Sequence, residues 1–227
     1  MNSAIILLSG GLDSAVSLAV IKNQYKNILA LTFNYGQISF HSEYKSAKTI
    51  SDYFKIKHIT VELDWLKNIS ASSLNKGINI PQLTNKDLDN VILTEKSAKA
   101  VWVPNRNGLF VNIAACYAEA FDYDTIIIGA NKEEGATFKD NTPEFIKAIN
   151  NSFKNSVNKK LELIAPFINL NKTEIVKKGT ELDFPFEFLH SCYENSDKHC
   201  GKCESCVRLK RALELNERYD IIDKLFN

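Results

Sequence analysis

Short apolar runs alternate with amphipathic segments in the first third of the chain. Residues 4–8 and 27–33 are mainly apolar runs rich in branched side chains, which is typical of buried strands, and residues 58–63 alternate like a third strand. Residues 15–22 have helical spacing, and residues 42–54 are predicted as a second helix. This order of strands and helices predicts an α/β fold with a doubly wound parallel sheet.

The pattern changes between residues 67 and 99. Asn, Ser, Lys and Thr dominate this stretch, and Gly77 and Pro81 interrupt it. We expect a surface excursion with room for a short helix, and a candidate for a loop that covers the substrate.

Regular patterning returns with a long helix over residues 109–121. Five apolar side chains recur at helical spacing, so we expect them to line one face of the helix; they are Phe110, Ile113, Ala114, Tyr117 and Phe121. Cys116 lies within this stretch and is interpreted as a small core residue.

Towards the C-terminus, another buried strand and several helices are predicted. The strand covers residues 124–129, and the helices cover residues 143–150, 172–182, 208–217 and 219–226. We expect a nucleotide-binding α/β domain over residues 1–170. A small helical tail that carries a metal site is expected over residues 171–227.

Composition and charge narrow the classes of partner. The chain is 44% hydrophobic and 24% charged, which is ordinary for a globular protein. A net charge of +1 gives no basic field, so we expect no nucleic-acid partner. The apolar runs are too short to span a bilayer, and the N-terminus lacks the basic and long apolar regions of a signal peptide. We therefore expect a cytoplasmic protein with no membrane partner.

The segment Ser-Gly-Gly-Leu-Asp-Ser follows the first predicted strand and opens the first helix. Gly10 and Gly11 can take backbone angles closed to other residues, and the N–H groups and dipole of the helix point at this turn. These features predict an anion site for phosphate or pyrophosphate. Ser9 and Ser14 can add hydroxyl donors, and Asp13 can hold Mg²⁺ between phosphate oxygens.

Three other interpretations of the segment are weaker. It lacks the lysine of the Gly-x-x-x-x-Gly-Lys loop and the spacing of a dinucleotide fingerprint. A plain tight turn, with Asp13 or Ser14 as a helix cap, is the simpler alternative. The position directly after the first strand favours the nucleotide site.

The loop resembles that of the ATP-pyrophosphatase (PP-loop) superfamily, whose members bind ATP and transfer AMP to a substrate oxygen. The resemblance implies an adenine nucleotide alpha hydrolase-like fold. It also implies that ATP is bound by Leu8, Ser9, Gly10, Gly11, Leu12, Asp13, Ser14, Ala15, Val16, Ser17 and Leu18. The loop by itself does not name the substrate.

Four of the five cysteines crowd into a short stretch near the C-terminus; they are Cys192, Cys200, Cys203 and Cys206. Four thiolates with two-residue gaps suit a tetrahedral structural zinc site, with one Zn²⁺ per chain. An iron–sulfur cluster and a redox dithiol are the alternatives. His190 and His199 are spare candidate ligands, and with four cysteines available we expect both to be bystanders.

Several further motifs resemble the 7-cyano-7-deazaguanine (preQ0) synthases of queuosine biosynthesis. They are the segments 33–37, 103–107, 165–166, 171–176 and 191–194, followed by the Cys-Gly-Lys-Cys-x-x-Cys run. The resemblance covers the chain in order, except for about residues 70–100. Two places depart from the family: residues 38–41 replace its Arg-His, and residues 138–142 replace its Tyr-Pro-Asp-Cys-Arg.

Physical interpretations accompany these motifs. Tyr35 at a strand end can stack on a flat base, and Gln37 can hydrogen-bond that base. Arg106 can hold a phosphate or carboxylate, Asn107 can orient a carboxyl or amide oxygen, and Lys172 can counter the charge on departing pyrophosphate. The simpler alternatives are a core Tyr35, a solvated Lys172 and an Asn107 that only caps a helix.

The resemblance implies that 7-carboxy-7-deazaguanine, ammonium and ATP are the substrates. Two ATP-dependent activations, first of the acid and then of the amide, would give the nitrile. No glutaminase-like Cys/His arrangement is found in the sequence, so free ammonia or a separate donor protein would supply the nitrogen. A homodimer is expected. A tRNA thiolase, another amidating ligase and a nucleotide-sensing module are the rival functions.

Overall fold

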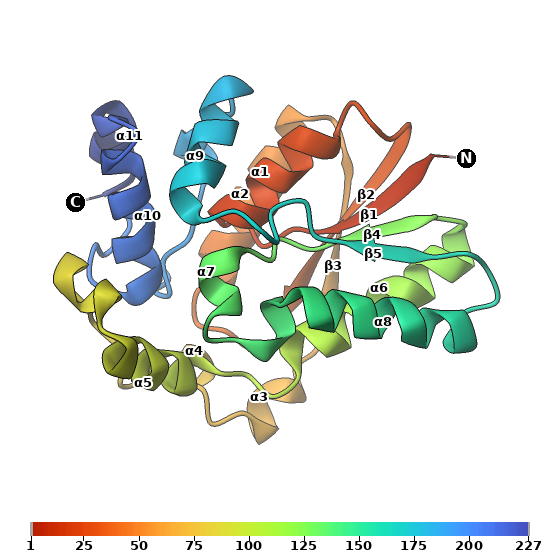
Figure 1. Cartoon of the computed structure of the whole chain (residues 1–227), viewed down its shortest axis with the longest axis horizontal. Coiled ribbons are helices and arrows are strands. Elements are labelled where there is room, and N and C mark those ends of the chain that lie inside the picture. Colours follow the sequence, from red (N-terminus) through yellow and green to blue (C-terminus); the bar gives the residue numbers. More distant parts are fainter. Residues whose placement is uncertain (1, 227) are drawn as a thin grey trace.

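The computed structural model describes residues 2–226 and contains a five-stranded parallel sheet with the order β3-β2-β1-β4-β5. Its strands are β1 (Ser3–Leu7), β2 (Asn27–Asn34), β3 (Lys57–Glu62), β4 (Thr125–Ile127) and β5 (Glu162–Ile164). The main helices over the sheet are α1 (Leu12–Ile21), α2 (Phe40–Tyr53), α6 (Arg106–Phe121) and α8 (Pro143–Ser156). Figure 1 shows the sheet between two layers of helices, which confirms the doubly wound fold.

The central strand β1 is buried on both faces. Ala4 and Ile6 belong to the core that contains α1 and α2, whereas Ile5 and Leu7 belong to the core that contains α6 and α8. A strand covered on both sides needs apolar side chains at every position. The continuous apolar run in the sequence reflects this burial.

The winding of the chain reverses next to β1. After β1 the chain continues to β2 and β3 on one side, and it later returns to β4 and β5 on the other. Parallel pairs such as Leu7 with Leu31 and Ile6 with Ile127 set the register. In such sheets, ligands bind at the carboxyl ends of the strands where the winding reverses.

The predicted surface excursion contains more helix than expected. It holds α3 (Leu66–Ile69), α4 (Ser73–Lys76), the 3₁₀ turn η1 (Asn85–Asp89) and α5 (Val91–Val101). The side chain of Asn90 caps α5 by accepting from the amides of Ile92 and Leu93. The buried face of α5 includes Thr94 and Ser97, so it carries no apolar stripe that would predict a helix.

Most of the predicted apolar face of α6 lies against the core: Phe110 and Ala114 are buried, and Ile113 and Tyr117 are partly buried against the same core. Val111, Ala115 and Ala118 are buried there, whereas Phe121 is 63% exposed and Cys116 is exposed. The prediction that Cys116 is a core residue is therefore wrong, and Phe121 lies outside the buried part of the predicted face.

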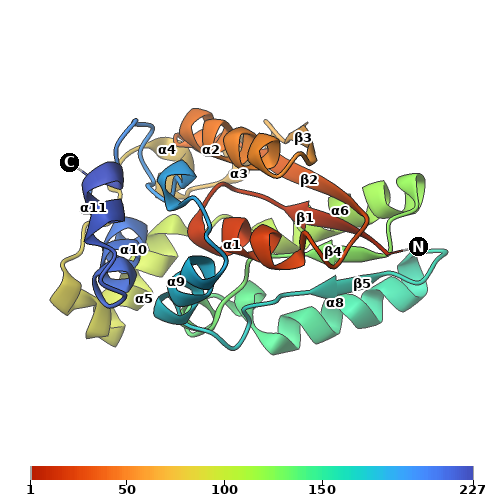
Figure 2. The same ribbon diagram turned by 90° about the horizontal axis from the view of Figure 1, so that it is seen from above.

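The tail packs directly on the sheet domain. It contains α9 (Lys172–Glu181), α10 (Glu204–Glu214) and α11 (Tyr219–Leu225), with the short turn η3 (Phe186–Phe188) between α9 and α10. Ile175 of α9 and Leu209 of α10 share a core with Val16 of α1. Figure 2 shows α9 beside α1, and α10 and α11 beyond the end of the sheet. The division at residue 170 stays a prediction.

Within residues 2–226, none of the helices combines the length and the apolar character needed to cross a membrane.

Candidate active site and metal centre

The predicted phosphate-binding segment of residues 9–14 (the phosphate loop) is tightly packed at Gly10. This residue has a φ of +81°, and a Cβ atom there would lie 2.6 Å from Ser46 Oγ and 2.8 Å from the carbonyl oxygen of Glu43. Gly11 is the N-cap of α1 with a φ of −78°, which other residues can adopt. Position 10 therefore requires glycine for two reasons: the backbone has a positive φ, and there is no room for a Cβ atom.

The two loop serines are hydrogen-bonded to each other and to the loop backbone. Ser14 Oγ lies 3.1 Å from Ser9 Oγ and donates to the carbonyl of Gly11 at 3.2 Å. The amide of Gly11 donates to Ser9 Oγ at 3.3 Å. These bonds hold the loop in shape, and the role of the hydroxyls on phosphate stays a prediction.

The end of β4 lies against the first turn of α1. A Cβ atom on Gly129 would be 2.7 Å from the amide nitrogen of Ser14. Only glycine allows this close approach. The sequence predicts residue 129 only as the end of a strand. The one sequence signal for its close contact with α1 is a glycine directly after a buried strand.

Lys172, the first residue of α9, lies between two carboxylates. Its Nζ is 2.8 Å from Asp13 Oδ2 and 2.8 Å from Glu134 Oε1, and its side chain is 7% exposed. The structure therefore brings the predicted Asp13 and Lys172 into direct contact. Lys172 is buried, so the alternative of a solvated face residue is wrong.

Asp13 has an unusual electrostatic environment. Burial, opposed by Lys172, raises the pKa of Asp13 to about 6. For Glu134, burial would also raise the pKa, but Lys172 and Arg106 hold it below the ordinary value. Asp13 Oδ1 is buried and has no hydrogen-bond partner among the described residues. A divalent cation would satisfy this oxygen.

Arg106 begins α6 and reaches the same cavity. Its guanidinium donates to the hydroxyl of Tyr35 at 3.2 Å and lies 5.7 Å from the centre of that ring. Tyr35 is 5% exposed, so its ring supports Arg106 from a largely buried position. Asn107 donates from Nδ2 to the carbonyl of Asp140 at 3.4 Å, which ties α6 to the short turn η2 (Lys139–Asn141).

One cavity at the carboxyl ends of β1 and β4 joins these groups. Six residues of the predicted nucleotide-binding segment line the cavity: Leu8, Ser9, Gly11, Leu12, Asp13 and Ser14. The other predicted site residues that line it are Tyr35, Arg106, Asn107 and Lys172. Ala15, Val16, Ser17 and Leu18 are buried in α1 and do not line it.

Gln37 also lies outside the cavity lining. Its amide donates to the carbonyl of Phe33 and to Glu43, and it accepts from the amide of Tyr35. Gln37 thus holds the turn after β2, and its predicted contact with a base stays a prediction.

The sequence did not single out a second group of charged residues that line the cavity. Arg208 of α10 forms ion pairs with Glu133 at 3.0 Å and with Glu204 at 2.8 Å. The helical spacing of Glu204 and Arg208 was the only sequence signal for this pair. Six carboxylates and three cations line the cavity, namely Asp13, Glu43, Glu133, Glu134, Asp140 and Glu204 with Arg106, Lys172 and Arg208. A polyphosphate would need additional positive charge there.

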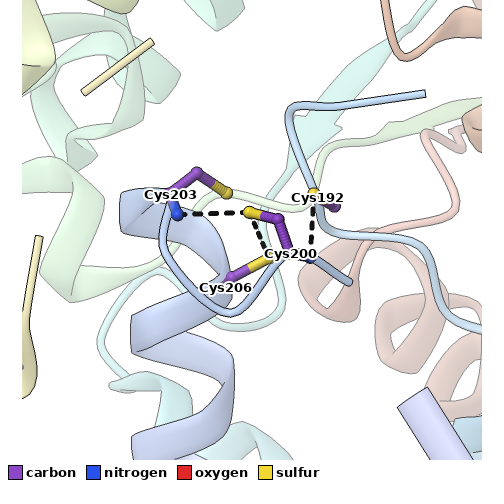
Figure 3. A group of neighbouring side chains, drawn as sticks. All are labelled: Cys192, Cys200, Cys203 and Cys206. Carbon is purple, nitrogen blue, oxygen red and sulfur yellow. Dashed lines mark hydrogen bonds between the residues drawn. The ribbon is translucent and has the colours of Figure 1, made fainter. Parts of the chain in front are cut away.

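The four cysteines of the tail converge on one point (Figure 3). Their sulfur atoms all lie within 4.8 Å of one another, and Cys200 Sγ is 3.8 Å from Cys206 Sγ. A zinc ion with Zn–S distances of about 2.3 Å would place tetrahedral ligand atoms about 3.8 Å apart. The cluster can therefore hold a tetrahedral metal ion.

The two nearby histidines are engaged elsewhere. His199 Nε2 accepts from the amide of Ser191 at 2.9 Å, and its Nδ1 lies 3.2 Å from the carbonyl of Leu225. His190 Nε2 is 3.1 Å from the carbonyl of Glu194. Neither belongs to the group of candidate metal-ligating residues found within residues 2–226. That both histidines are bystanders stays a prediction.

A glycine loop at the reversal point of a doubly wound sheet, which opens a helix and carries Asp13, defines the class of PP-loop nucleotide-binding proteins. The family description "Queuosine biosynthesis protein QueC" matches residues 3–217. The chain belongs to this family.

Curated relatives agree over nearly the full length. The chain is 46% identical to the 7-cyano-7-deazaguanine synthase of Methanobrevibacter smithii over 219 residues, which cover 96% of both chains. It is 47% identical to the 7-cyano-7-deazaguanine synthase of Methanosphaera stadtmanae, with 92% of both chains covered.

Among solved structures, the chain resembles a 4-thiouridine synthetase in complex with RNA and ATP, with a TM-score of 0.50 and 18% identity. The match covers 98% of this chain and 52% of that one. At this identity the likeness shows a shared fold.

Proposed function

We propose that this chain converts 7-carboxy-7-deazaguanine and ammonia to 7-cyano-7-deazaguanine with ATP, in queuosine biosynthesis. The observation that carries the proposal is membership of the QueC family over residues 3–217, combined with a cavity that joins the phosphate loop to Arg106 and Lys172. The relatives at 46% and 47% identity bear the name of this activity.

The chemistry requires two activations. In the first, a substrate carboxylate oxygen attacks the α-phosphorus of ATP, pyrophosphate leaves, and ammonia then displaces AMP to form an amide. In the second, the amide oxygen attacks the α-phosphorus of another ATP, pyrophosphate leaves, and the nitrogen gives up one proton. Loss of AMP and of the remaining N–H proton then leaves the nitrile. Each step replaces a poor oxygen leaving group with a phosphate ester.

Each candidate residue has a place in this scheme. The amides at the start of α1 would bind the pyrophosphate, and Lys172 would offset the charge that develops on it. Arg106 is partly buried, and the one hydrogen bond of its guanidinium among the described residues is to Tyr35, so it retains donors for the substrate carboxylate. Asn107 would orient the acid or amide oxygen.

Two metal ions are part of the proposal. The buried, unpartnered Asp13 Oδ1 and the excess of carboxylates in the cavity support Mg²⁺ on the ATP phosphates. Bound Mg²⁺ would neutralise phosphate charge and orient the leaving group. Zn²⁺ would occupy the four cysteines as a structural ion, because four protein ligands leave no open position.

We further propose that the protein is a cytoplasmic homodimer with small-molecule substrates and no nucleic-acid partner. The net charge of +1 supports the absence of a nucleic-acid partner. Cys116 is the only cysteine outside the metal cluster, so the nitrogen would come from free ammonia or a separate protein. Sedimentation analysis tests the dimer.

Purified protein with ATP, Mg²⁺, ammonium and 7-carboxy-7-deazaguanine tests the activity. We expect the nitrile, detected by mass spectrometry, with AMP and pyrophosphate as co-products. Formation of the amide alone would identify an amidating ligase. ATP-dependent modification of an RNA instead would indicate a tRNA thiolase. Either result, or no ATP-dependent product, contradicts the proposal.

A further inference from the structure

A segment of the metal-bearing tail lies directly on the phosphate loop. The amide of His190 donates to the carbonyl of Gly10 at 3.0 Å, and the amide of Leu12 donates to Ser191 Oγ at 3.3 Å. A Cβ atom at Gly11 would lie 3.5 Å from Ser191 Oγ, which is ordinary contact distance. One wall of the loop is therefore built by residues more than 170 positions away along the chain.

The hydroxyl of Ser191 lies where a phosphate oxygen would be received. The amide of Leu12 belongs to the first turn of α1, whose N–H groups have no partner within the helix. Here that amide donates to Ser191 Oγ, so this oxygen occupies an acceptor position at the helix N-terminus. Ser191 also lines the cavity that contains Asp13 and Lys172.

The hydroxyl still has a proton to offer. A serine hydroxyl can accept and donate at the same time. Within residues 2–226, Ser191 Oγ accepts from Leu12, and no acceptor for its own hydrogen is found. An incoming phosphate oxygen would provide that acceptor.

The backbone of Ser191 is held from the tail side. Its amide donates to His199 Nε2 at 2.9 Å, and the other ring nitrogen of His199 bonds the carbonyl of Leu225. His199 is 2% exposed, and the neighbouring Cys192 is 1% exposed within the metal cluster. The folded tail thus fixes where the Ser191 hydroxyl lies.

We propose that Ser191 is a phosphate-binding residue of the active site, which the tail positions so that its hydroxyl donates to the pyrophosphate portion of ATP. The inference rests on the proposed function only in that the loop binds the phosphates of ATP. It assigns to the tail a contact with the substrate in addition to its metal site.

Pyrophosphate binding measured by titration calorimetry tests this assignment without the deazapurine substrate. The matched pair is Ser191→Thr, which keeps a hydroxyl, and Ser191→Val, which has nearly the same shape without one. We expect Ser191→Val to bind pyrophosphate about tenfold more weakly than Ser191→Thr, because a hydrogen bond to a charged group is lost. Ser196→Ala is the control, since its hydroxyl bonds Lys198 in the same tail away from the cavity.

Equal pyrophosphate affinity of the Thr and Val variants would overturn the proposal. Metal content and melting temperature are measured on both variants. If Ser191 has only a structural role, the substitutions would change these two properties without producing a difference in pyrophosphate affinity. If the nitrile assay fails while the affinity difference persists, the proposed substrate falls and the assignment of Ser191 stands.

Discussion

At the scale of single residues, Lys172 has the most demanding position in the cavity. One ammonium group contacts two carboxylates, Asp13 and Glu134, and all three are largely shielded from water. A buried lysine that forms ion pairs with two carboxylates is held in place and keeps its charge. It can therefore counter the charge of a leaving pyrophosphate without reorganisation.

Lys172→Met should lower kcat for nitrile formation by about a hundredfold, because a preorganised charge at the leaving group is removed. Steady-state kinetics on the purified variant measure the effect. Lys177→Met is the matched control, since Lys177 is exposed on the same helix. A kcat within threefold of the wild type would show that Lys172 does not act on the leaving group.

Asp13 should give the protein a characteristic pH dependence of stability. Burial raises its pKa from 3.8 to about 6, so the native state keeps a proton that the unfolded chain has lost in this range. The stabilisation from this proton is complete below pH 3.8 and disappears as the pH rises through about 6. Over that window the contribution is about 2 to 3 kcal/mol.

Melting temperatures of the wild type and Asp13→Asn, measured without Mg²⁺ between pH 4 and pH 7, check this expectation. The variant has no carboxyl to titrate at this position. As the pH increases, the melting temperature of the wild type should therefore fall relative to that of the variant. Parallel curves for the two proteins would rule out a raised pKa at Asp13.

At the scale of elements, the turn between β1 and α1 uses its two glycines differently. Gly10 is confined by Ser46 and by a positive φ, whereas Gly11 has an ordinary φ and space around it. The first glycine serves the packing of the loop against α2. The second lies beside the helix N-terminus, where the anion is expected.

The pair Gly10→Ala and Gly11→Ala separates these roles. Gly10→Ala should lower the free energy of unfolding by about 2 to 4 kcal/mol, from strain and overlap with Ser46. Gly11→Ala should stay within about 1 kcal/mol of the wild type but lose ATP-dependent activity, because its methyl group projects towards the phosphate site. Denaturant unfolding and the nitrile assay measure the two effects. Equal destabilisation by both substitutions would contradict the distinction.

At the scale of the whole molecule, the tail and the sheet domain form one packed unit around the cavity. The cysteine cluster, α10 and α9 share a core with α1, and Ser191 and Arg208 reach from the tail into the cavity. The cysteine cluster is therefore connected to the phosphate loop through this shared core. For this reason we expect loss of a bound metal ion to weaken pyrophosphate binding at the phosphate loop.

Removal of the metal with a strong chelator should lower the melting temperature and weaken pyrophosphate binding together, because the ion contributes to folding of the tail. Calorimetry before and after chelation, with metal content measured in parallel, gives both values. Restoration by one equivalent of Zn²⁺ is the control. Unchanged pyrophosphate affinity in the metal-free protein would separate the tail from the loop.

Local features of the sequence predicted much of this molecule. The apolar runs of β1 and β2, the alternation of β3, the glycine loop and the cysteine spacing each depend on residues close together in the chain, so a short window reveals them. Helix α5 escaped prediction because its buried face includes the polar residues Thr94 and Ser97. For α6 the helical spacing identified Phe110 and Ala114, which are buried, but it did not show that Phe121 at the end of the helix is exposed.

Sequence alone determined the class of fold, the phosphate loop with Asp13, and four thiols spaced for one metal ion. Tertiary structure decided which distant side chains complete the cavity: Glu133, Glu134, Ser191 and Arg208 come from segments that meet only when the sheet winds in both directions and the tail packs on α1. Such contacts depend on the packing of whole elements, and no short stretch of sequence carries a signal for them.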